Sequence, residues 1–465
     1  MVGDLKHTGG TKIVCTIGPA TSAESELTAL VEAGMNVARL NFAHGDHAQH
    51  AAVLARIRAI SERLDTPIAV LQDLGGPKVR IGTVAGGSVT LDAGQLVVLT
   101  TEAVEGSPTR VSVSYENLPR EVEAGDTLLL ADGTIQLRVE RVAGTEIHCR
   151  VVVGGRLSSR KGVNVPSGLS GLPLLGAKDL EDLRFGLDHD VDYVGVSFVR
   201  SAEDVHTAQA HIEGLGGTSR VIAKIETQAA LDHFDAIADA ADGIMIARGD
   251  LSLETPFARV PIVQKQLIAK ARRRAKPVIT ATQMLYSMVS SPQPTRAEVS
   301  DVANAILDGS DAVMLSEETA VGEYPVRAVE VLSTIALETE GGRPPDALSL
   351  DAMEPLTEEE AVVQAACQLA GRLRSDVIVT ITQTGEAARF AAKCRPRQPI
   401  LALTSDRRTY RRLALVRGVV PLLLPVSSVH VPDPLETVRK AIHERGWQGK
   451  RAVLLSAERV WRATL

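Results

Sequence analysis

The sequence predicts an α/β protein: a (β/α)8 TIM barrel with an inserted small β-barrel lid domain and a C-terminal doubly wound α/β domain. Three observations lead to this prediction. Eight apolar runs alternate with segments of helical periodicity, short alternating runs interrupt this series after the third run, and further strand–helix units follow a linker. A chain of 465 residues is long enough for two or three such domains.

The barrel is predicted from eight strand–helix units. The predicted strands are 12–17, 36–42, 67–74, 193–199, 221–226, 243–250, 277–283 and 312–318. The predicted helices include 24–33, 54–64, 263–274 and 298–307, where apolar residues recur with helical spacing. Gly34 and Gly309 lie where helices should end, and Pro277 lies where a strand should begin.

The interruption lies between the third and fourth barrel strands. Its short alternating runs are separated by Gly, Asp and Pro, which is typical of a small all-β domain. These runs are 88–91, 96–100, 127–130, 135–139 and 147–153. A domain inserted at the mouth of a barrel is most simply a mobile lid, although a passive ornament is the alternative.

The C-terminal part begins after a Gly- and Pro-rich linker near residue 341. Its predicted strands are 376–381, 400–404, 419–424 and 452–455, with helices between them. This alternation predicts a doubly wound parallel sheet. The predicted domains are therefore 1–77 with 170–341 for the catalytic barrel, 78–169 for the lid, and 346–465 for a regulatory-type domain.

Composition excludes several classes of partner. The net charge of −7 gives no electrostatic footprint for nucleic acid. No apolar stretch approaches the ~20 residues of a membrane span, and the polar start lacks an apolar signal region. The four cysteines have neither metal-ligand nor disulfide spacing, so we expect reduced thiols in a cytoplasmic protein.

Charged side chains gather at the carboxyl ends of the predicted strands, where barrels carry their chemistry. Lys224 and Glu226 are two residues apart and project to one face, and Arg248 and Asp250 follow the next strand. Two carboxylates beside two fixed cations suit a divalent metal that holds a phosphorylated anion, whereas surface salt bridges are the alternative. The other strand ends supply Arg39, Asn41, Asp73, Thr282, Gln283, Ser316 and Glu318.

These residue types favour phosphoryl transfer or enolate chemistry, because they comprise acids, bases and donors without a Ser-His-Asp or Cys-His set. No Walker A pattern occurs, so a nucleotide is not held by that kind of phosphate loop.

Several motifs resemble those of pyruvate kinases. The segments TKIVCTIGPAT (11–21), GMNVARLNFAHG (34–45), AKIET (223–227) and ARGDLSLE (247–254) are similar to that family in type and order. A long match at 294–325 completes the set. The resemblance covers nearly all of the first 335 residues and is weaker in the inserted and C-terminal domains.

The resemblance implies transfer of the phosphoryl group of phosphoenolpyruvate to ADP, giving pyruvate and ATP in glycolysis, by a cytoplasmic homotetramer. It implies catalytic roles for Lys224, Arg39, Thr282 and Ser316. The implied substrate-binding residues are Arg39, Lys224, Ala247, Arg248, Gly249, Asp250 and Thr282. Glu226 and Asp250 would hold Mg²⁺ or Mn²⁺, and the nucleotide would lie near Asn41, His44, Arg80 and Lys161.

The chain departs from the family at the monovalent-cation region, which comprises Asn41, Asp73, Leu74 and Lys78. Many members hold K⁺ with Ser and Thr oxygens and a nearby Glu, and here these positions are Ala43, Leu74 and Lys78. The Lys78 ammonium can take the electrostatic role of K⁺, so K⁺ is predicted not to be required. Glu317, Ser252 and Tyr286 also replace usual residues, although none of them removes a metal or phosphoryl ligand.

In the C-terminal domain, Thr382, Thr384 and Gly385 form a loop similar to the family's site for an effector sugar phosphate. Glu386 adds a repelling charge, so weak or absent activation by fructose bisphosphate is expected, and a simple helix cap is the alternative.

Two other functions compete with the kinase. A phosphoenolpyruvate-using lyase or mutase would share the metal site but would not need a lid for a nucleotide. A metabolite-sensing pseudoenzyme would keep the fold without turnover, which the intact Arg39, Lys224 and Asp250 argue against.

Overall fold

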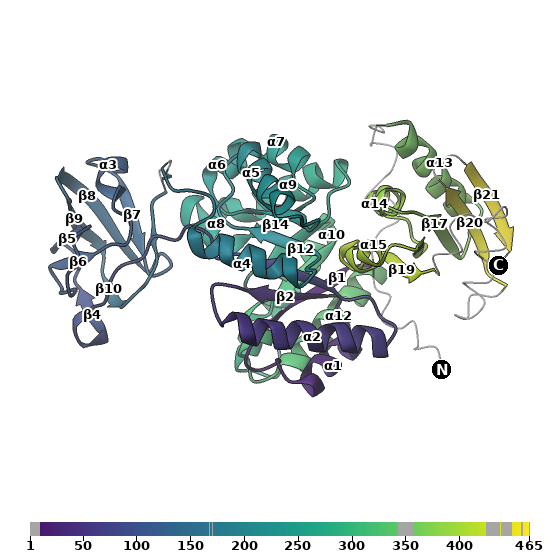
Figure 1. Ribbon diagram of the computed structural model, residues 1–465, viewed down its shortest axis with the longest axis horizontal. Coiled ribbons are helices and arrows are strands. Elements are labelled where there is room, and N and C mark those ends of the chain that lie inside the picture. The colour runs from purple at the N-terminus through teal and green to yellow at the C-terminus, as the bar shows by residue number, and fades with distance from the viewer. Residues whose placement is uncertain are drawn as a thin grey trace.

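The computed structural model describes residues 10–166, 168–169, 171–342, 357–424, 438, 449–456 and 459–464. Eight parallel strands close into a barrel in the order β1-β16-β15-β14-β13-β12-β3-β2 (Figure 1). The strands are β1 (Lys12–Ile17), β2 (Val37–Asn41), β3 (Ala69–Asp73), β12 (Tyr193–Val196), β13 (Arg220–Ile225), β14 (Gly243–Ala247), β15 (Val278–Ala281) and β16 (Ala312–Leu315). The predicted barrel is therefore confirmed.

Helices surround the barrel and bury their apolar faces against its strands in one large core. They are α1 (Glu24–Ala33), α2 (His47–Arg63), α4 (Ala177–Asp188), α5 (Ala202–Gly214), α6 (Gln228–Asp232), α7 (Phe234–Ala240), α8 (Arg248–Glu254), α9 (Val260–Arg273), α10 (Arg296–Asp308), α11 (Glu317–Ala320) and α12 (Pro325–Gly341). Local sequence fixes several ends: Asp46 and Thr295 form capping boxes, and Gly34 ends α1 with a φ of 122°.

Four predicted strands extend two or three residues too far at their carboxyl ends. Strands predicted to end at residues 199, 250, 283 and 318 end at Val196, Ala247, Ala281 and Leu315. At two of these ends a helix begins almost at once, α8 at Arg248 and α11 at Glu317. Arg248 and Asp250 therefore lie on a helix at the barrel mouth and not on a strand. The prediction missed this because an apolar run does not show where the chain leaves the strand.

The inserted segment forms two sheets around a core of its own. The six-stranded sheet has the order β11-β7-β8-β9-β5-β6, and β4 pairs with β10. The elements are β4 (Ser88–Leu91), β5 (Leu96–Thr100), β6 (Arg110–Ser112), α3 (Leu118–Glu121), β7 (Thr127–Leu130), β8 (Ile135–Ala143), β9 (Glu146–Val153), β10 (Gly155–Ser158) and β11 (Val163–Asn164). These strands lie at one end of the molecule (Figure 1).

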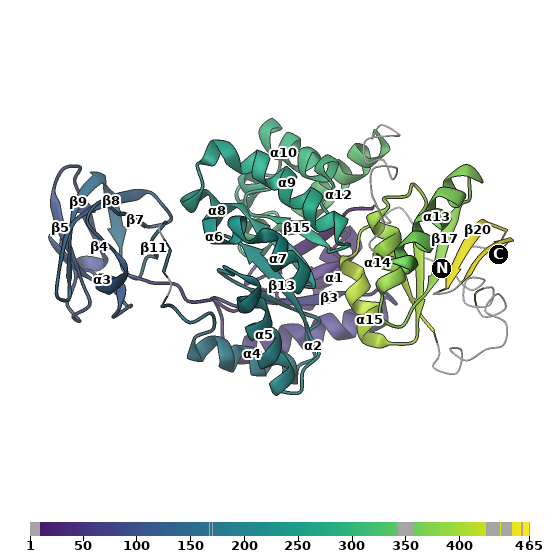
Figure 2. The ribbon, with the colours of Figure 1, turned by 90° about the horizontal axis from the view of Figure 1, so that it is seen from above.

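The C-terminal part lies at the opposite end of the barrel, as the view from above also shows (Figure 2). Its sheet has the order β19-β18-β17-β20-β21, and its strands are parallel except for the edge strand β21, which runs antiparallel to β20. The elements are α13 (Glu358–Arg372), β17 (Val377–Ile381), α14 (Glu386–Lys393), β18 (Ile400–Thr404), α15 (Arg407–Arg412), β19 (Val419–Leu423), β20 (Arg451–Ser456) and β21 (Arg459–Thr464). The antiparallel edge strand β21 was not predicted.

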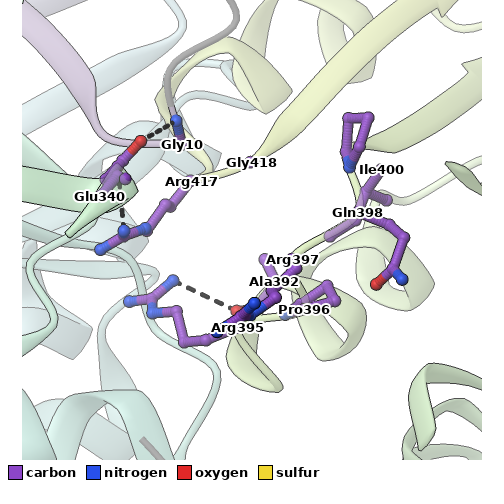
Figure 3. Close-up of a pocket in the computed structure, with 12 residues that line it drawn as sticks. Gly10, Glu340, Ala392, Arg395, Pro396, Arg397, Gln398, Ile400, Arg417 and Gly418 are labelled. Atoms are coloured by element: carbon purple, nitrogen blue, oxygen red, sulfur yellow. Dashed lines mark hydrogen bonds and ion pairs between the residues drawn. The ribbon is translucent and has the colours of Figure 1, made fainter. Parts of the chain in front are cut away.

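Contacts with the C-terminal part form at the amino-terminal ends of the barrel strands. Lys12 at the start of β1 donates to the Val419 carbonyl at 2.8 Å. A cavity of about 400 Å³ lies at the same interface, with Arg395, Arg417 and Glu340 among its walls (Figure 3). The opposite, carboxyl ends of the strands are left to face the inserted segment.

Two further observations bear on the sequence expectations. All four cysteines are buried and free. Among the helices of the described ranges, none is long and apolar enough to cross a membrane.

Candidate active site

Lys224 lies at the centre of the polar cluster at the barrel mouth. Its ammonium Nζ lies 2.7 Å from Ser197 Oγ, 3.0 Å from Glu226 Oε1 and 3.2 Å from Asp73 Oδ1. Burial on its own lowers the pKa of Lys224, but the charges of Asp73 and Glu226 outweigh it and leave the pKa raised. The side chain is therefore a fixed cation in a site where only 9% of the residue is exposed.

Arg39 supplies a second fixed cation beside Asp73. Its Nε donates to Asp73 Oδ2 at 2.6 Å, and its Nη1 donates to Thr16 Oγ1 at 2.8 Å. Burial raises the pKa of Asp73, yet Lys224 and Arg39 prevail and hold that pKa below its usual value. Residues from β1, β2, β3 and β13 thus form one charged network that fixes both cations.

The carboxylates of Glu226 and Asp250 are near enough to repel each other. Glu226 is 1% exposed, and its Oε2 accepts the Phe198 N–H at 2.8 Å. Burial raises the pKa of Glu226; the Lys224 ammonium opposes this rise, and the Asp250 carboxylate adds to it. Two carboxylates that repel each other at a partly open mouth are a suitable pair of ligands for a divalent cation.

Lys78 lies on the connection to the inserted segment and points to the same place. Its Nζ is 3.7 Å from Asp250 Oδ1 on α8 and 3.8 Å from Asp132 Oδ1 in the β7–β8 turn. The ammonium therefore stands between the barrel and the inserted segment. Leu74, also predicted for the monovalent-cation region, is buried, and its carbonyl accepts from Ser197 Oγ at 2.8 Å.

The loop after β15 is strained and tightly held. Thr282 and Gln283 both have positive φ angles, of 70° and 54°, which side chains with a Cβ rarely adopt. Thr282 Oγ1 accepts the Gly249 N–H at 2.9 Å, so the threonine lies against the first turn of α8. This contact places Thr282, Ala247 and Gly249 side by side at the mouth.

Arg248 holds this loop rather than the open mouth. Its guanidinium donates to the Thr282 carbonyl at 2.7 Å and to the Ala281 carbonyl at 3.3 Å, and it pairs with Asp301 of α10 at 2.7 Å. Because these bonds use the guanidinium donors, the Arg248 side chain would act on a bound substrate indirectly, by positioning the backbone of the loop.

Ser316 lies between the end of β16 and the start of α11. Its backbone N–H donates to Glu318 Oε2 at 2.7 Å, and Glu318 is 1% exposed. Burial raises the pKa of Glu318, while backbone N–H groups, including those of Leu285 and Ser316, lower it in part. Glu318 therefore fixes the two loops that follow β15 and β16, and Glu317 next to it opens α11.

The residues predicted for the nucleotide lie around the edge of the mouth. Asn41 ends β2, and its side chain accepts the Ala43 N–H at 3.1 Å, while His44 in the same loop is exposed. Arg80 pairs with Gly162 across the two connections to the inserted segment, which places it next to Lys161. Both cations are exposed there.

The predicted effector loop is a closed turn. Thr382 Oγ1 accepts the Gly385 N–H at 2.9 Å, and Thr384 Oγ1 lies 3.2 Å from Glu386 Oε2. Gly385 has a φ of 85° and begins α14. The Thr384 hydroxyl, which the sequence predicted as a phosphate ligand, is therefore already bonded to the Glu386 carboxylate.

Sequence reasoning missed three residues of the site. The hydroxyl oxygens of Ser197 and Thr16 accept hydrogen bonds from Lys224 and Arg39, and both residues lie at strand ends, which is the signal that would have found them. Glu254, at the end of α8, lines a cavity of about 270 Å³ beneath the connection to the inserted segment. Burial raises its pKa to about 7, and Glu226 and Asp250 add to the rise.

Comparisons with known proteins agree with this geometry. The family model of the pyruvate kinase barrel domain matches residues 8–329, and that of the pyruvate kinase alpha/beta domain matches residues 360–461. Pyruvate kinase 2 of Synechocystis is 47% identical over 439 residues, 93% of this chain and 73% of that protein. The pyruvate kinase of Thermococcus litoralis is 45% identical over 89% of this chain and 88% of its own.

A solved structure extends the likeness to the whole chain. The crystal structure of a pyruvate kinase from Cryptosporidium parvum is 36% identical, covers 100% of this chain and 98% of its own, and has a TM-score of 0.93.

Proposed function

The chain belongs to the pyruvate kinase family, and from this premise we propose that it transfers the phosphoryl group of phosphoenolpyruvate to ADP, giving pyruvate and ATP. The observation that carries this proposal is the pair of buried cations, Lys224 and Arg39, fixed by Asp73 at the barrel mouth. Such preorganised cations stabilise the charge that spreads over a transferring phosphoryl group.

Lys224 has two roles in this proposal. Its ammonium faces the transferring phosphoryl group, and it also neutralises the enolate oxygen that develops as the phosphoryl group leaves. Arg39 contacts the phosphoryl oxygens from the other side. Gly249 and Ala247 bind the substrate carboxylate through their backbone, next to the Thr282 hydroxyl. Thr282 and Ser316 then lie where a proton could be delivered to the enolate carbon.

Glu226 and Asp250 are the proposed ligands of a divalent cation, Mg²⁺ or Mn²⁺. Within the described ranges, no set of three or more His, Cys, Asp or Glu side chains gathers to hold a metal. Two carboxylates, with the remaining positions left to substrate oxygens and water, are what Mg²⁺ prefers. The bound cation would neutralise the phosphate and the developing enolate.

The inserted segment, residues 78–169, is proposed as the lid. Asn41, His44, Arg80 and Lys161 would surround the nucleotide as the lid closes and water is excluded. The Lys78 bridge between Asp132 of the lid and Asp250 of the barrel supports this assignment, because it ties lid position to a proposed metal ligand.

We further propose activity without K⁺. Ala43 offers no side-chain oxygen, the Leu74 carbonyl already accepts from Ser197, and the Asp73 charge is matched by Arg39 and Lys224. The test is turnover in a K⁺-free tetramethylammonium buffer. Activation by added K⁺ of more than about tenfold would reject the proposal.

The glycolytic role, the homotetramer and the cytoplasmic location are proposals that rest on the family alone. The contact between Thr384 and Glu386 supports a further proposal, that activation by fructose bisphosphate is weak or absent. A large drop in the half-saturating substrate concentration on titration with fructose bisphosphate would contradict this proposal.

The decisive assay couples pyruvate production to lactate dehydrogenase. Turnover that requires both phosphoenolpyruvate and ADP supports the kinase. Pyruvate formed without ADP would point to a lyase, and binding without turnover would point to a pseudoenzyme.

A further inference from the structure

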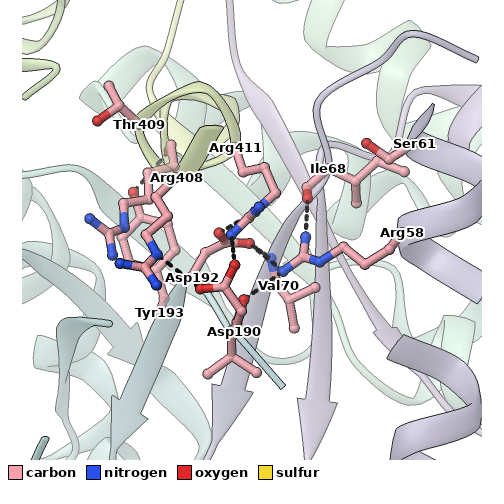
Figure 4. A network of polar contacts seen from close by, with 12 residues as sticks. Arg58, Ser61, Ile68, Val70, Asp190, Asp192, Tyr193, Arg408, Thr409 and Arg411 are labelled. Atoms are coloured by element: carbon pink, nitrogen blue, oxygen red, sulfur yellow. Dashed lines mark hydrogen bonds and ion pairs between the residues drawn. The ribbon is translucent and has the colours of Figure 1, made fainter. Parts of the chain in front are cut away.

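A second cavity, of about 140 Å³, lies between the barrel and the C-terminal domain. Its barrel wall is formed where strands begin: Tyr193 and Arg220 open β12 and β13, and Lys276 precedes β15. Its other wall comes from α14 and α15, with Arg389 and Arg412. Figure 4 shows Tyr193, one of the lining residues, near the ion pairs that join the two domains.

The walls of this interdomain cavity carry more positive than negative charge. The lining cations are Arg220, Arg274, Lys276, Arg389 and Arg412, and the lining acids are Asp242 and Glu386. Two of the cations are neutralised, since Arg220 pairs with Asp242 at 3.1 Å and Arg274 pairs with Asp239 at 2.6 Å, outside the cavity. Among the described residues, Arg389 has one acidic partner, Glu386 at 3.8 Å, and it also donates to the Thr384 carbonyl at 3.4 Å.

Lys276 and Arg412 have neutral partners alone within the described residues. Lys276 Nζ donates to the Ala241 carbonyl at 2.7 Å and to the Asp239 carbonyl at 3.2 Å. Arg412 Nη2 donates to Thr218, while its Nε is buried and, among the described parts of the chain, has no hydrogen-bond partner. A half-buried cation with neutral partners and an unused donor is costly unless an anion is supplied.

Burial is the main cause of the lowered pKa values of Lys276 and Arg412. Burial lowers the pKa of Lys276; the carboxylates of Asp242 and Asp239 oppose this effect, and the guanidinium groups of Arg389 and Arg220 add to it by a smaller amount. Burial also lowers the pKa of Arg412, and Arg220 acts in the same direction.

We propose that the interdomain cavity binds a small oxyanion of the phosphate class, held by Lys276, Arg389 and Arg412. Guanidinium and ammonium donors form their strongest hydrogen bonds with such oxygens. The cavity volume of about 140 Å³ is several times the volume of about 30 Å³ that one water molecule takes up in the liquid. The cavity therefore has room for one phosphate-sized group. An anion there would join α14 and α15 to the starts of strands whose other ends carry Lys224 and Thr282.

This site is separate from the barrel mouth and adjoins the predicted effector loop, because Thr384 and Glu386 also line the cavity. The barrel mouth lies at the opposite ends of the same strands, and the effector loop would hold a phosphate with the backbone and hydroxyls of Thr382–Gly385. The proposal does not depend on the proposed reaction, because its test measures binding and not turnover.

The probe is selenate, which has the geometry of phosphate and is located in crystals by its anomalous scattering. We expect anomalous density in the cavity of the parent protein and of Arg273→Gln. Arg273 is an exposed residue of α9 that does not line the cavity, so this variant is a control for the loss of one positive charge nearby. We expect no cavity density in Lys276→Gln, while any density at the barrel mouth persists.

The solution test is a titration with inorganic phosphate, followed by thermal unfolding. The cavity affinity should fall about tenfold or more in Lys276→Gln and stay unchanged in Arg273→Gln. Among the residues that the structure describes, Lys276 has no ion-pair partner, so the variant should fold, and Arg389→Gln is the second variant if it does not. A parent cavity without selenate density, or density that persists in both variants, would overturn the proposal.

Discussion

Lys224 shows how a single residue can combine stability with chemistry. Its buried charge is compensated by Asp73 and Glu226, and these carboxylates in turn depend on it. Breaking a buried ion pair from one side typically costs about 3–5 kcal/mol, because the other charge is left buried alone. The network is therefore both the proposed catalytic apparatus and a structural element of the barrel mouth.

Replacement of Lys224 by Met should lower kcat by about 10²–10³-fold, the usual cost of removing one preorganised donor. The lactate-coupled assay measures the rate. Lys265→Met, which removes the ion pair between the half-exposed Lys265 and Asp308 of α10, is the matched control and should keep the parental rate. Parental turnover by Lys224→Met would refute the assignment of this side chain.

Glu254 should make stability depend on pH. Its folded pKa is about 7, raised from 4.5 chiefly by burial. Below pH 4.5 the carboxyl is neutral in both folded and unfolded chains; as the pH rises to about 7 the unfolded chain ionises first and the folded state loses stability. A shift of this size corresponds to roughly 3 kcal/mol at most.

Denaturant unfolding without divalent metal, at pH 5 and pH 8, measures this effect. Glu254→Gln should be more stable than the parent at pH 8 and similar to it at pH 5. Glu213→Gln, at an exposed position on α5, should follow the parent at both pH values. A parallel pH dependence of parent and Glu254→Gln would show that Glu254 is not the titrating group.

The identities of most site residues could be predicted from the sequence because strand ends are readable. Lys224, Glu226 and Asp73 lie where the alternation of apolar runs and charges predicted. The partners that hold them could not be read in the same way. Ser197 contacts Lys224 from a neighbouring strand, and strand adjacency in the closed barrel decides which side chains meet.

At the scale of elements, the starts of strands were predicted better than their ends. Within the inserted segment, β4, β5 and β7 have the predicted bounds. The three-residue β6 and the two-residue β11 were missed because such short strands have too few residues to show alternation.

The β7–β8 turn shows how the lid contacts the barrel. Gly133 has a φ of 82°, and a Cβ at this position would lie 2.7 Å from Leu253 Cδ2 on α8. The neighbouring Asp132 faces Lys78. The turn therefore rests on the helix that carries the proposed metal ligand Asp250, and small changes here should alter how the lid closes.

Gly133→Ala should displace the turn from α8 and raise the half-saturation for ADP about fivefold, which corresponds to a loss of about 1 kcal/mol. Coupled assays at varied ADP measure this change. Gly133→Ala combined with Leu253→Ala should recover part of the affinity, because the clash is removed. Gly144→Ala, at a lid turn with no neighbour within 4 Å, is a control with similar backbone strain and should leave the value unchanged.

For the whole molecule, the interface between barrel and C-terminal domain depends on contacts that the sequence does not reveal. Asp192 precedes β12 and is buried; it accepts from Arg411 of α15 at 2.7 Å and from Arg58 of α2 at 3.0 Å (Figure 4). Asp190 accepts from Arg411 at 2.6 Å. Partners separated by 219 positions cannot be paired from charge pattern alone, although both domains were predicted.

The last prediction concerns this interface. Arg411 is 14% exposed and Asp192 is 0% exposed at the side chain, so Arg411→Gln leaves a buried carboxylate short of one cation and should cost about 3–5 kcal/mol. The cost falls on the interface, so we expect calorimetry to show one unfolding transition for the parent and two for Arg411→Gln, with the C-terminal domain unfolding first.

Arg407→Gln is the matched control for that experiment. Arg407 lies on the same helix and pairs with Glu62 of the barrel, but at 3.6 Å and with 72% of its side chain exposed. Exposed pairs of this kind contribute about 0–1 kcal/mol, so its transition should stay close to that of the parent. Equal effects of the two substitutions would mean that charge on α15, rather than the buried pair, joins the two domains.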